Sequence, residues 1–440
     1  MLQHRDLIQQ LIAVIDRALS RQLNMIIHAP AFQQLEASWR GIQWLLLEVP
    51  NDKAIQVKLL NVSYRELSRD ILNAIEFDQS LLFNKIYSSE FDQAGGKPFG
   101  LLIGDYYFSH RISPQQGDGL SVLSAMSKIA AAAFAPFVSG LHPSFFGLDE
   151  FSELKPSLNL NAIFRQQEYN RWQQLRLGDD ARFIGLVLPR VLIRKPYNAH
   201  GVHLNHRYFT ETVSRHSDYL WANACYAYAM VAINAFIETG WFADMRGVNP
   251  KTYSGGVVTQ LPRDHHAPTP GHTQCKLSTE IAITNQQERA LTDQGFLALK
   301  DYPQLQLSVF YSSQSIQKPL VYEDAVASAN AKISGMLHYL MCAARFAHYV
   351  KIIIRDKVGS FISPSNCQEF LQDWIMNYCT RTSSSNNTAS AQAPLNEAKV
   401  QIHEQMGMPG KYLCTLHLKP HYQLDELQSQ LRLVTKITLT

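Results

Sequence analysis

The sequence has little that would suit a nucleic-acid-binding, secreted or disulfide-stabilised protein. An excess of one charge is lacking, because 40 basic and 37 acidic side chains leave a formal charge of only +3. This balance gives no electrostatic case for a nucleic-acid partner. Six cysteines are scattered without any C-x-x-C pair, which predicts reduced thiols in a cytoplasmic protein. The first residues are no signal peptide, since Asp16, Arg17 and Arg21 interrupt their apolar positions.

Long uninterrupted apolar runs are also scarce. The single candidate for a membrane span is the segment from Tyr219 to Ile237, which contains Asn223 and Asn234 and is closely flanked by Asp218 and Glu238. A helix buried inside a large protein has the same composition. We therefore expect no membrane insertion.

Motifs of common enzymes are missing as well. Gly95-Gly96-Lys97 is followed by Pro98 where a phosphate-binding loop needs Ser or Thr. No G-x-S-x-G nucleophile turn occurs. His200, His203 and His206 have helical spacing, but Gly201 and Asn205 disfavour a helix there. We expect no catalytic residue, no cofactor and no metal site.

A second group of histidines supports an alternative function. Asp264, His265, His266, His272 and Cys275 lie in a segment that is cut by three prolines. These side-chain types bind zinc, but they lack the close, regular ligand pairs of zinc sites. We interpret the segment as a proline-stiffened loop, and a metal-dependent hydrolase using the loop near His265 is kept as the alternative.

The patterns that are present mix helix and strand, which predicts an α+β fold. Apolar residues at helical spacing predict helices at 7–19, 32–47, 67–75, 120–134, 217–241, 323–354 and 367–378. Ser217 is the predicted N-cap of the fifth helix. Alternation or short apolar runs predict strands at 55–59, 99–103, 183–188, 281–283 and 305–311. A loop rich in Pro, Gly and His is predicted at 247–271.

The last part of the chain changes character, and we divide the chain into a core region, 1–322, and a C-terminal region, 323–440. A polar, low-complexity linker at 381–394 precedes strand-like alternation at 399–404, 412–418 and 431–439. Unpaired strand edges attract strands of other chains. We therefore predict a β-rich tail that pairs with other subunits by strand addition, through Tyr412, Cys414, Leu416, Leu418, Leu431, Leu433, Ile437 and Leu439.

Several segments, spread in order over the whole chain, resemble those of one known family, the large sheath subunit of bacterial type VI secretion systems (TssC, VipB or EvpB). Many separate matches in sequence order are more specific than any single motif. The matching segments include L-E-A-S-W-R-G at 35–41, A-P-F at 135–137, F-F-G at 145–147, D-A-R-F-I-G-L at 180–186, Y-L-W-A-N at 219–223, R-F-A-H-Y-V-K at 345–351 and K-P-H-Y at 419–422.

This resemblance implies a structural role without catalytic residues. Family members pair with a small sheath subunit (TssB/VipA-like), and the pairs polymerise with copies of themselves around an inner tube protein (Hcp-like). Contraction of the sheath then drives effector delivery, and a ClpV-type ATPase disassembles the contracted sheath. In the family, the tail strands pair with strands of the partner and of a neighbouring subunit.

The resemblance has one departure, at the N-terminus. Family members carry an extension that supplies an arm strand to a neighbouring subunit and a segment read by ClpV, whereas this chain starts almost at the first amphipathic helix. A mis-called start codon, a truncated paralogue that pairs but does not polymerise, and a variant with altered linkage between subunits are three explanations. The resemblance therefore implies pairing with the small subunit, but not recycling by ClpV.

Overall fold

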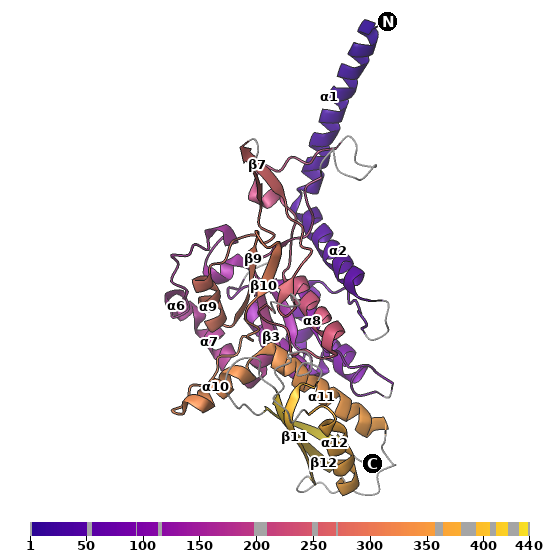
Figure 1. The fold of residues 1–440 in the computed structure, drawn as a ribbon, viewed down its shortest axis with the longest axis vertical. Helices are drawn as coiled ribbons and strands as arrows, with labels where there is room; N and C mark the ends of the chain where they lie inside the picture. Colours follow the sequence, from indigo (N-terminus) through magenta and orange to yellow (C-terminus); the bar gives the residue numbers. More distant parts are fainter. Residues whose placement is uncertain are drawn as a thin grey trace.

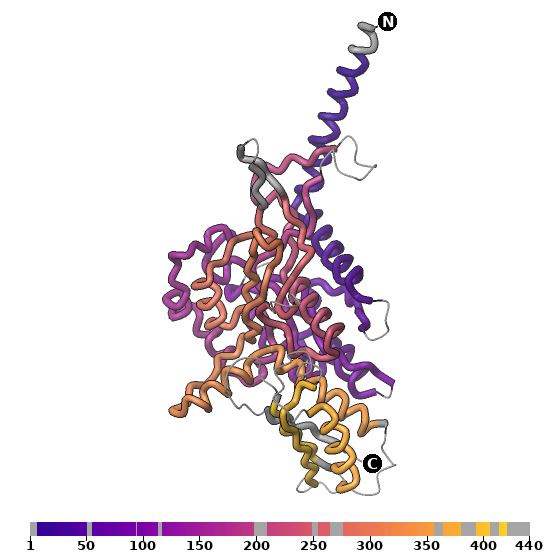
Figure 2. Tube along the Cα trace, viewed as in Figure 1, coloured from indigo at the N-terminus to yellow at the C-terminus, as the bar shows by residue number. Residues whose placement is uncertain are grey.

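The chain folds into an elongated molecule with a central sheet (Figure 1). This computed structural model describes residues 2–50, 55–93, 95–112, 117–197, 209–248, 254–269, 272–356, 364–379, 393–404, 411–420 and 431–438. The N-terminal helix α1 (Leu2–Ile27) stands out from the body at one end, and the C-terminal strands lie at the other end (Figure 2). Helices and mixed sheets share the chain, so the predicted α+β class is confirmed.

The helices begin at local capping signals in several places. Ser63 caps α3 in a reciprocal box with Glu66, and Thr284 does the same for α9 with Gln287. After α1, the helices are α2 (Pro30–Glu48), α3 (Tyr64–Asn73), α4 (Leu81–Phe83), α5 (Gly119–Ala132), α6 (Leu160–Ile163), α7 (Asn170–Leu177), α8 (Cys225–Thr239), α9 (Asn285–Asp293), α10 (Ala325–Ser334), α11 (Leu337–Asp356) and α12 (Pro364–Met376).

The central sheet has six strands, of which the first four are parallel and the last two antiparallel. Their order across the sheet is β1 (Leu102–Phe108), β2 (Phe137–Leu141), β3 (Ile184–Leu188), β9 (Phe296–Tyr302), β10 (Leu307–Phe310) and β6 (Val257–Val258). Two small antiparallel pairs accompany it, β4 (Val191–Leu192) with β5 (Trp221–Ala222), and β7 (His265–Thr269) with β8 (His272–Cys275).

Both faces of the central sheet are buried, which explains why its parallel strands read as continuous apolar runs. On one face, Val138, Val187 and Leu297 pack in a core with residues of α2, α8 and α11. On the other face, the neighbouring residues of the same strands pack against α5 and α7. The first of these cores also includes residues of the C-terminal sheet, so the two ends of the sequence share one hydrophobic core.

The helix predicted from Ser217 begins later, at Cys225. The carboxylate of Asp218 accepts hydrogen bonds from the backbone N–H groups of Ser214 and Arg215, which closes a tight turn instead of a helical one. The next residues then pair as β5 with β4. Long-range strand pairing therefore overrides the helical periodicity over the first part of this segment.

The helix predicted at 323–354 is two helices, α10 and α11. The break lies at Gly335 and Met336, where residues 313–315 bond to the backbone of the chain between the two helices. Ser315 donates its N–H to the carbonyl of Gly335, and Leu337 donates its N–H to the carbonyl of Ser313. These two bonds replace intrahelical ones, so the chain turns between the helices.

The strand predictions have mixed outcomes. The runs at 183–188 and 305–311 contain β3 and β10, and the run at 99–103 overlaps the start of β1. Residues 281–283 lead into α9 without forming a strand, and residues 55–59 belong to no strand among the described residues. In the predicted loop at 247–271, the structure has β6 and β7.

In the described part of the chain, no helix has both the length and the apolar character needed to cross a bilayer. The segment 219–237, whose composition made it the candidate membrane span, contains a helix that is largely buried in the core.

Candidate subunit interface

The predicted tail strands form a three-stranded antiparallel sheet at the end of the chain. Its order is β11 (Leu395–Glu404), β12 (Lys411–Pro420) and β13 (Leu431–Thr438). Predicted interface residues lie opposite one another across the two tail strands, with Leu416 facing Leu433 and Leu418 facing Leu431. Tyr412 likewise faces Ile437, whereas Leu439 lies outside the described residues.

The side chains of Cys414, Leu416 and Leu418 are buried inside this chain. They share a core with Cys367 and Leu371 of α12, and with residues of β11. Burial raises the pKa of the Cys414 thiol to about 12, so this cysteine is an inert core residue at neutral pH. These three side chains therefore stabilise the chain's own C-terminal core, and they are not available to a partner.

The backbone of β12 is also fully engaged, because β12 is the central strand of the sheet. It pairs with β11 along one edge and with β13 along the other. Strand addition by another subunit is therefore restricted to the outer edges of β11 and β13.

The outer edge of β11 is covered by helix α12 of the same chain. The side-chain amide of Gln372 donates to the carbonyl of Ala398 at 3.0 Å and accepts from the N–H of Val400 at 2.8 Å. One helical turn earlier, Gln368 accepts from the N–H of Ile402 at 3.0 Å. Two glutamines four residues apart thus satisfy the edge of a strand, a device that sequence periodicity alone does not reveal.

The outer edge of β13 has no strand beside it within the described residues. It is eight residues long and lies at the end of the molecule furthest from α1 (Figure 1). An edge strand of this length carries a row of backbone N–H and C=O groups that a strand of another chain can pair with.

A second candidate surface lies on α1 and α2. The apolar residues of the predicted amphipathic helix are exposed, and exposed apolar residues continue on α2. We call this surface the α1–α2 stripe. It consists of Leu7, Ile8, Leu11, Ile12, Val14, Ile15, Leu19, Leu23, Met25 and Ile26 of α1, and of Phe32, Leu35, Trp39, Leu46 and Leu47 of α2.

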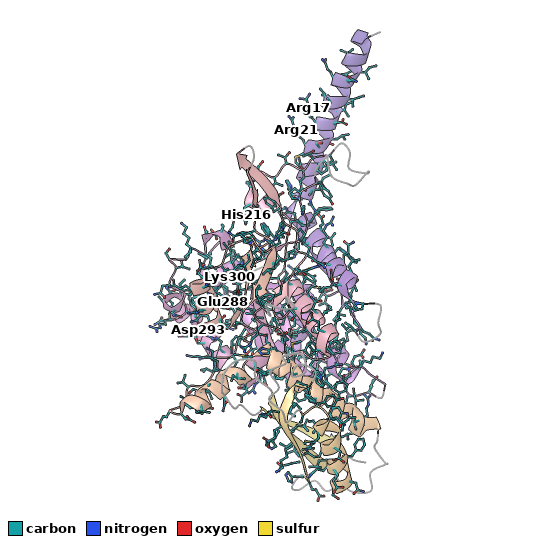
Figure 3. All side chains as sticks on the ribbon, viewed as in Figure 1. Arg17, Arg21, His216, Glu288, Asp293 and Lys300 are labelled. Carbon is teal, nitrogen blue, oxygen red and sulfur yellow. The ribbon has the colours of Figure 1, made fainter. Side chains whose placement is uncertain are left out.

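The α1–α2 stripe gathers fifteen exposed large apolar side chains, and large exposed apolar patches mark interaction sites. Trp39 is 62% exposed and Leu47 is 76% exposed, although both residue types favour the interior. The spacing of three and four residues covers about half of the circumference of α1. Arg17 and Arg21 lie on the other face, and Figure 3 shows both on the part of α1 that stands clear of the body. This geometry fits packing against helices of another chain.

Helix α2 holds the stripe in place because its other face is bound to the body. Gly41 lies against the ring of Tyr226 on α8, so closely that a Cβ at this position would be 2.5 Å from the ring. The hydroxyl groups of Ser38 and Tyr226 both donate to one carboxylate oxygen of Asp105 in β1. The position of α2, and with it the direction of α1, is therefore fixed by close packing of Gly41 on the Tyr226 ring and by the partly buried carboxylate of Asp105.

A buried ionic network fixes the junction between α1 and α2. Arg194 bonds to Glu211 at 2.5 Å and to Glu36 of α2 at 2.8 Å. His28, which follows α1, lies 3.1 Å from the other oxygen of Glu211. Burial alone would raise the pKa of Glu211, but hydrogen bonds from Arg194 and from the backbone of Tyr197 hold it below its ordinary value. Glu211 is therefore a buried anion that connects both helices to the body.

The histidine groups of the alternative function lie largely outside the described residues. His200, His203 and His206 are not described, and of His265, His266, His272 and Cys275 only the backbone is, as the hairpin β7–β8. Asp264 beside it accepts a hydrogen bond from the hydroxyl of Tyr219 at 2.9 Å. Among the described side chains, no three His, Cys, Asp or Glu residues form a group that could hold a metal ion.

Comparisons with known proteins cover nearly all of the chain. The family model VipB, described as the EvpB/VC_A0108 tail sheath N-terminal domain, matches residues 9–317. A second model, VipB_2, described as the EvpB/VC_A0108 tail sheath gpW/gp25-like domain, matches residues 326–437. The chain is also similar to the type VI secretion system sheath protein TssC1 of Pseudomonas aeruginosa. The two are 40% identical over 435 residues, which cover 98% of this chain and 86% of that relative.

Proposed function

The chain belongs to the VipB/EvpB family of type VI secretion tail sheath proteins, and from this premise we propose that it acts as a force-transmitting structural subunit in the cytoplasm. It pairs with the small sheath subunit, and the pairs polymerise with copies of themselves around an inner tube protein. Contraction of this assembly delivers effectors. The subunit stores free energy in the way it packs, and catalyses no reaction.

The observation that carries this proposal is the contrast between the two edges of the C-terminal sheet. Gln372 of α12 protects the outer edge of β11, whereas no strand of the described residues pairs with the outer edge of β13. Proteins usually block such edges because they cause uncontrolled association. A sheet that has one edge protected and no further strand at the other is suited to directed strand addition. We therefore assign inter-subunit strand addition to β13, Leu431–Thr438, and assign the predicted residues of β12 to supporting it from within.

The α1–α2 stripe supports the second contact, the pairing with the small subunit. Its helical spacing suits a helical partner, and a face covering about half of the helix circumference suits a groove between two helices better than a single seam. Leaving this surface in water would promote aggregation of the free chain. The free energy of pairing thus comes from apolar burial along the stripe, while β13 supplies the connection between neighbouring pairs.

Two alternatives make different predictions. A truncated paralogue would pair through the α1–α2 stripe but would not polymerise. A metal-dependent hydrolase using the loop near His265 would bind zinc in a fixed ratio and would need no partner. Elemental analysis of the purified protein separates the hydrolase from both sheath functions.

Co-production with the small sheath subunit tests the proposal directly. We expect a stable complex in size-exclusion chromatography with light scattering, and tubular polymers in electron micrographs. A complex that stays a single pair supports the truncated paralogue. Elution of this chain as a well-behaved monomer beside the small subunit would contradict pairing altogether.

Neighbouring proline variants in β13 separate the role of its outer edge from its role in the fold. Because the N–H groups of successive residues point to opposite edges, only one of Leu433→Pro and Val434→Pro removes a hydrogen bond to β12. That variant lowers the thermal midpoint of the free chain. The other leaves the midpoint unchanged, and we expect it to abolish polymers while the pair with the small subunit still forms. Normal polymers from both variants would contradict strand addition at β13.

A further inference from the structure

The joint between α1 and α2 is not held by a continuous helical backbone. Ala29, which lies between the two helices, has an extended conformation (φ −65°, ψ 127°), and Pro30 is the first residue of α2. Because Pro30 has no N–H, it cannot donate the helical hydrogen bond that would continue α1 into α2. The angle between the two helices therefore depends on contacts outside their own backbone ladders.

One segment of the chain, residues 211–218, holds the α1 side of this joint, and we call it the bridging segment. The N–H of Thr212 donates to the side-chain oxygen of Asn24 at 3.3 Å, and the carboxylate of Glu211 lies 3.1 Å from Nε2 of His28. Among the described residues, no other hydrogen bond joins α1 to the body. The helix is thus held at its last turn only.

The same bridging segment also holds the first turn of α2. The side-chain amide of Gln33 donates to the carbonyls of Ser217 and Asp218, at 3.2 and 3.3 Å. Side chains on both sides of Ala29 therefore bond to one continuous support. A support shared in this way fixes the angle between the helices, which contacts on one helix alone would not do.

The bridging segment is itself anchored to the body. Glu211 at its start is buried and bonds to Arg194 at 2.5 Å. Near its end, the carboxylate of Asp218 closes the turn described above, and the indole N–H of Trp221 donates to the carbonyl of His216 at 2.9 Å. Figure 3 labels His216 near the end of the body from which α1 projects. The joint is therefore attached to a stiff part of the fold.

The angle at the joint matters because the α1–α2 stripe continues across it. Met25 and Ile26 lie just before the joint, Phe32 and Leu35 lie just after it, and all four side chains are exposed. A partner that covers both parts of the stripe needs them in one relative orientation. Fixing this orientation in the free chain removes part of the conformational entropy that binding would otherwise cost.

We propose that Asn24, His28 and Gln33 are positioning residues, which hold α1 and α2 on the bridging segment so that the α1–α2 stripe is preorganised for the small sheath subunit. This inference rests on the proposed pairing with that subunit. None of the three side chains belongs to the stripe itself. They act on pairing through the angle of the joint and not by contact with the partner.

Distances across the joint test this role in the free chain. Spin labels on noncanonical residues at positions 17 and 43, one on α1 and one on α2, report the distribution of these distances in pulsed electron spin resonance. We expect a narrow distribution in the unchanged chain and a broad one when Asn24→Ala and His28→Ala are combined. Gln33→Ala, which releases the other side of the joint, should broaden it as well. Distributions that stay narrow in these variants would overturn the proposal.

The affinity for the small sheath subunit gives the second readout. We expect the combined Asn24→Ala and His28→Ala variant to pair about tenfold more weakly. Its thermal midpoint should stay unchanged, because neither side chain belongs to the hydrophobic core and Glu211 keeps its bond to Arg194. His28→Gln is the matched control, since it keeps a donor for Glu211, and it should pair within about threefold of the unchanged chain.

The two readouts separate failure of this inference from failure of the proposed function. Broad distance distributions with unchanged pairing would overturn the positioning role and leave the proposed pairing intact. Weaker pairing with a broad distribution in the alanine variant, and neither change in His28→Gln, would support it. If the unchanged chain forms no complex with the small subunit, the proposed pairing fails and this inference fails with it.

Discussion

The backbone N–H of Val400 donates to the side-chain amide oxygen of Gln372 at 2.8 Å, so a helix side chain takes the position of a neighbouring strand along β11. The same amide donates to the carbonyl of Ala398, so it makes both kinds of hydrogen bond that a neighbouring strand would make. Among the described residues, β11 is thus bonded on its outer edge by a helix, whereas no further strand pairs with β13. This difference supports the proposed strand addition at β13, which the alternation of the tail strands does not locate by itself.

Replacing Gln372 tests whether its hydrogen bonds to the edge of β11 stabilise the fold. Gln372→Leu removes both hydrogen bonds and leaves two backbone groups of β11 unsatisfied, so we expect the free energy of unfolding to fall by about 1–3 kcal/mol. Urea denaturation of the free chain measures this change. Gln372→Glu is the matched control, since it keeps an acceptor for Val400 and should lose less. A Leu variant as stable as the Glu variant would contradict the account.

Breaking the buried network at the base of α1 should destabilise the fold far more than breaking a surface pair. Glu211→Gln leaves Arg194 buried with weaker compensation, and we expect a loss of about 3 kcal/mol in the free energy of unfolding. Arg182→Ala, which breaks an ion pair with the exposed Asp179, should cost less than about 1 kcal/mol. Chemical denaturation of the two variants under the same conditions gives the comparison. Equal losses would indicate that the network does not hold the junction.

Stability should fall in mild acid because of buried histidine. His348 is enclosed by the rings of Phe91 and Phe134, and burial lowers its pKa to about 4, helped by the nearby Arg345 and Lys351 cations against the hydrogen bond to the carbonyl of Ala133. The unfolded chain binds this proton near pH 6.5, whereas the folded chain resists it. The contribution of neutral His348 to the free energy of unfolding is therefore complete above about pH 6.5 and is lost progressively as the pH falls toward about 4.

A pH series of thermal midpoints checks this expectation. His348→Gln keeps a hydrogen-bond donor for Ala133 but does not titrate, so its midpoint should change less between pH 6.5 and pH 4 than that of the unchanged chain. Because both proteins share the other titrating groups, the difference between the two curves isolates His348. Parallel curves across this window would contradict the prediction.

Charge placed on the α1–α2 stripe should abolish pairing without affecting the free chain. Ile15 is 57% exposed, so Ile15→Glu costs the isolated fold little, but in the complex it would bury an unpaired carboxylate. We expect co-purification with the small sheath subunit to be lost, while the thermal midpoint of the free chain stays unchanged. Arg17→Glu on the polar face of α1 is the control and should pair normally. Loss of pairing in both variants would point to a helix defect rather than to the stripe.

The sequence predicted features that depend on local periodicity and missed those set by distant contacts. The Ala-rich helix at 120–134 is α5, and the tail strands are β12 and β13. The helix expected from Ser217 starts late because of the Asp218 turn and the β4–β5 pairing, neither of which leaves a periodic signal. The break between α10 and α11 is caused by bonds from residues 313–315, which periodicity cannot locate.

For the candidate interface too, the sequence predicted the strands but not which atoms cover them. Alternation correctly indicates that one face of β12 is buried, but it does not tell whether the covering atoms belong to the same chain or to a partner. Cys414, Leu416 and Leu418 are in fact covered by α12 and β11 of this chain. Likewise, the edge protection by Gln368 and Gln372 depends on α12 lying along β11, which is a tertiary relationship.

The central claim, that β13 lends its outer edge to another subunit, is tested most directly by electron cryomicroscopy of the polymer formed with the small sheath subunit. We expect a density map in which a strand from a different chain continues the C-terminal sheet beyond Leu431–Thr438 through backbone hydrogen bonds. A polymer in which that edge faces solvent, and in which subunits touch only through helices, would contradict the claim.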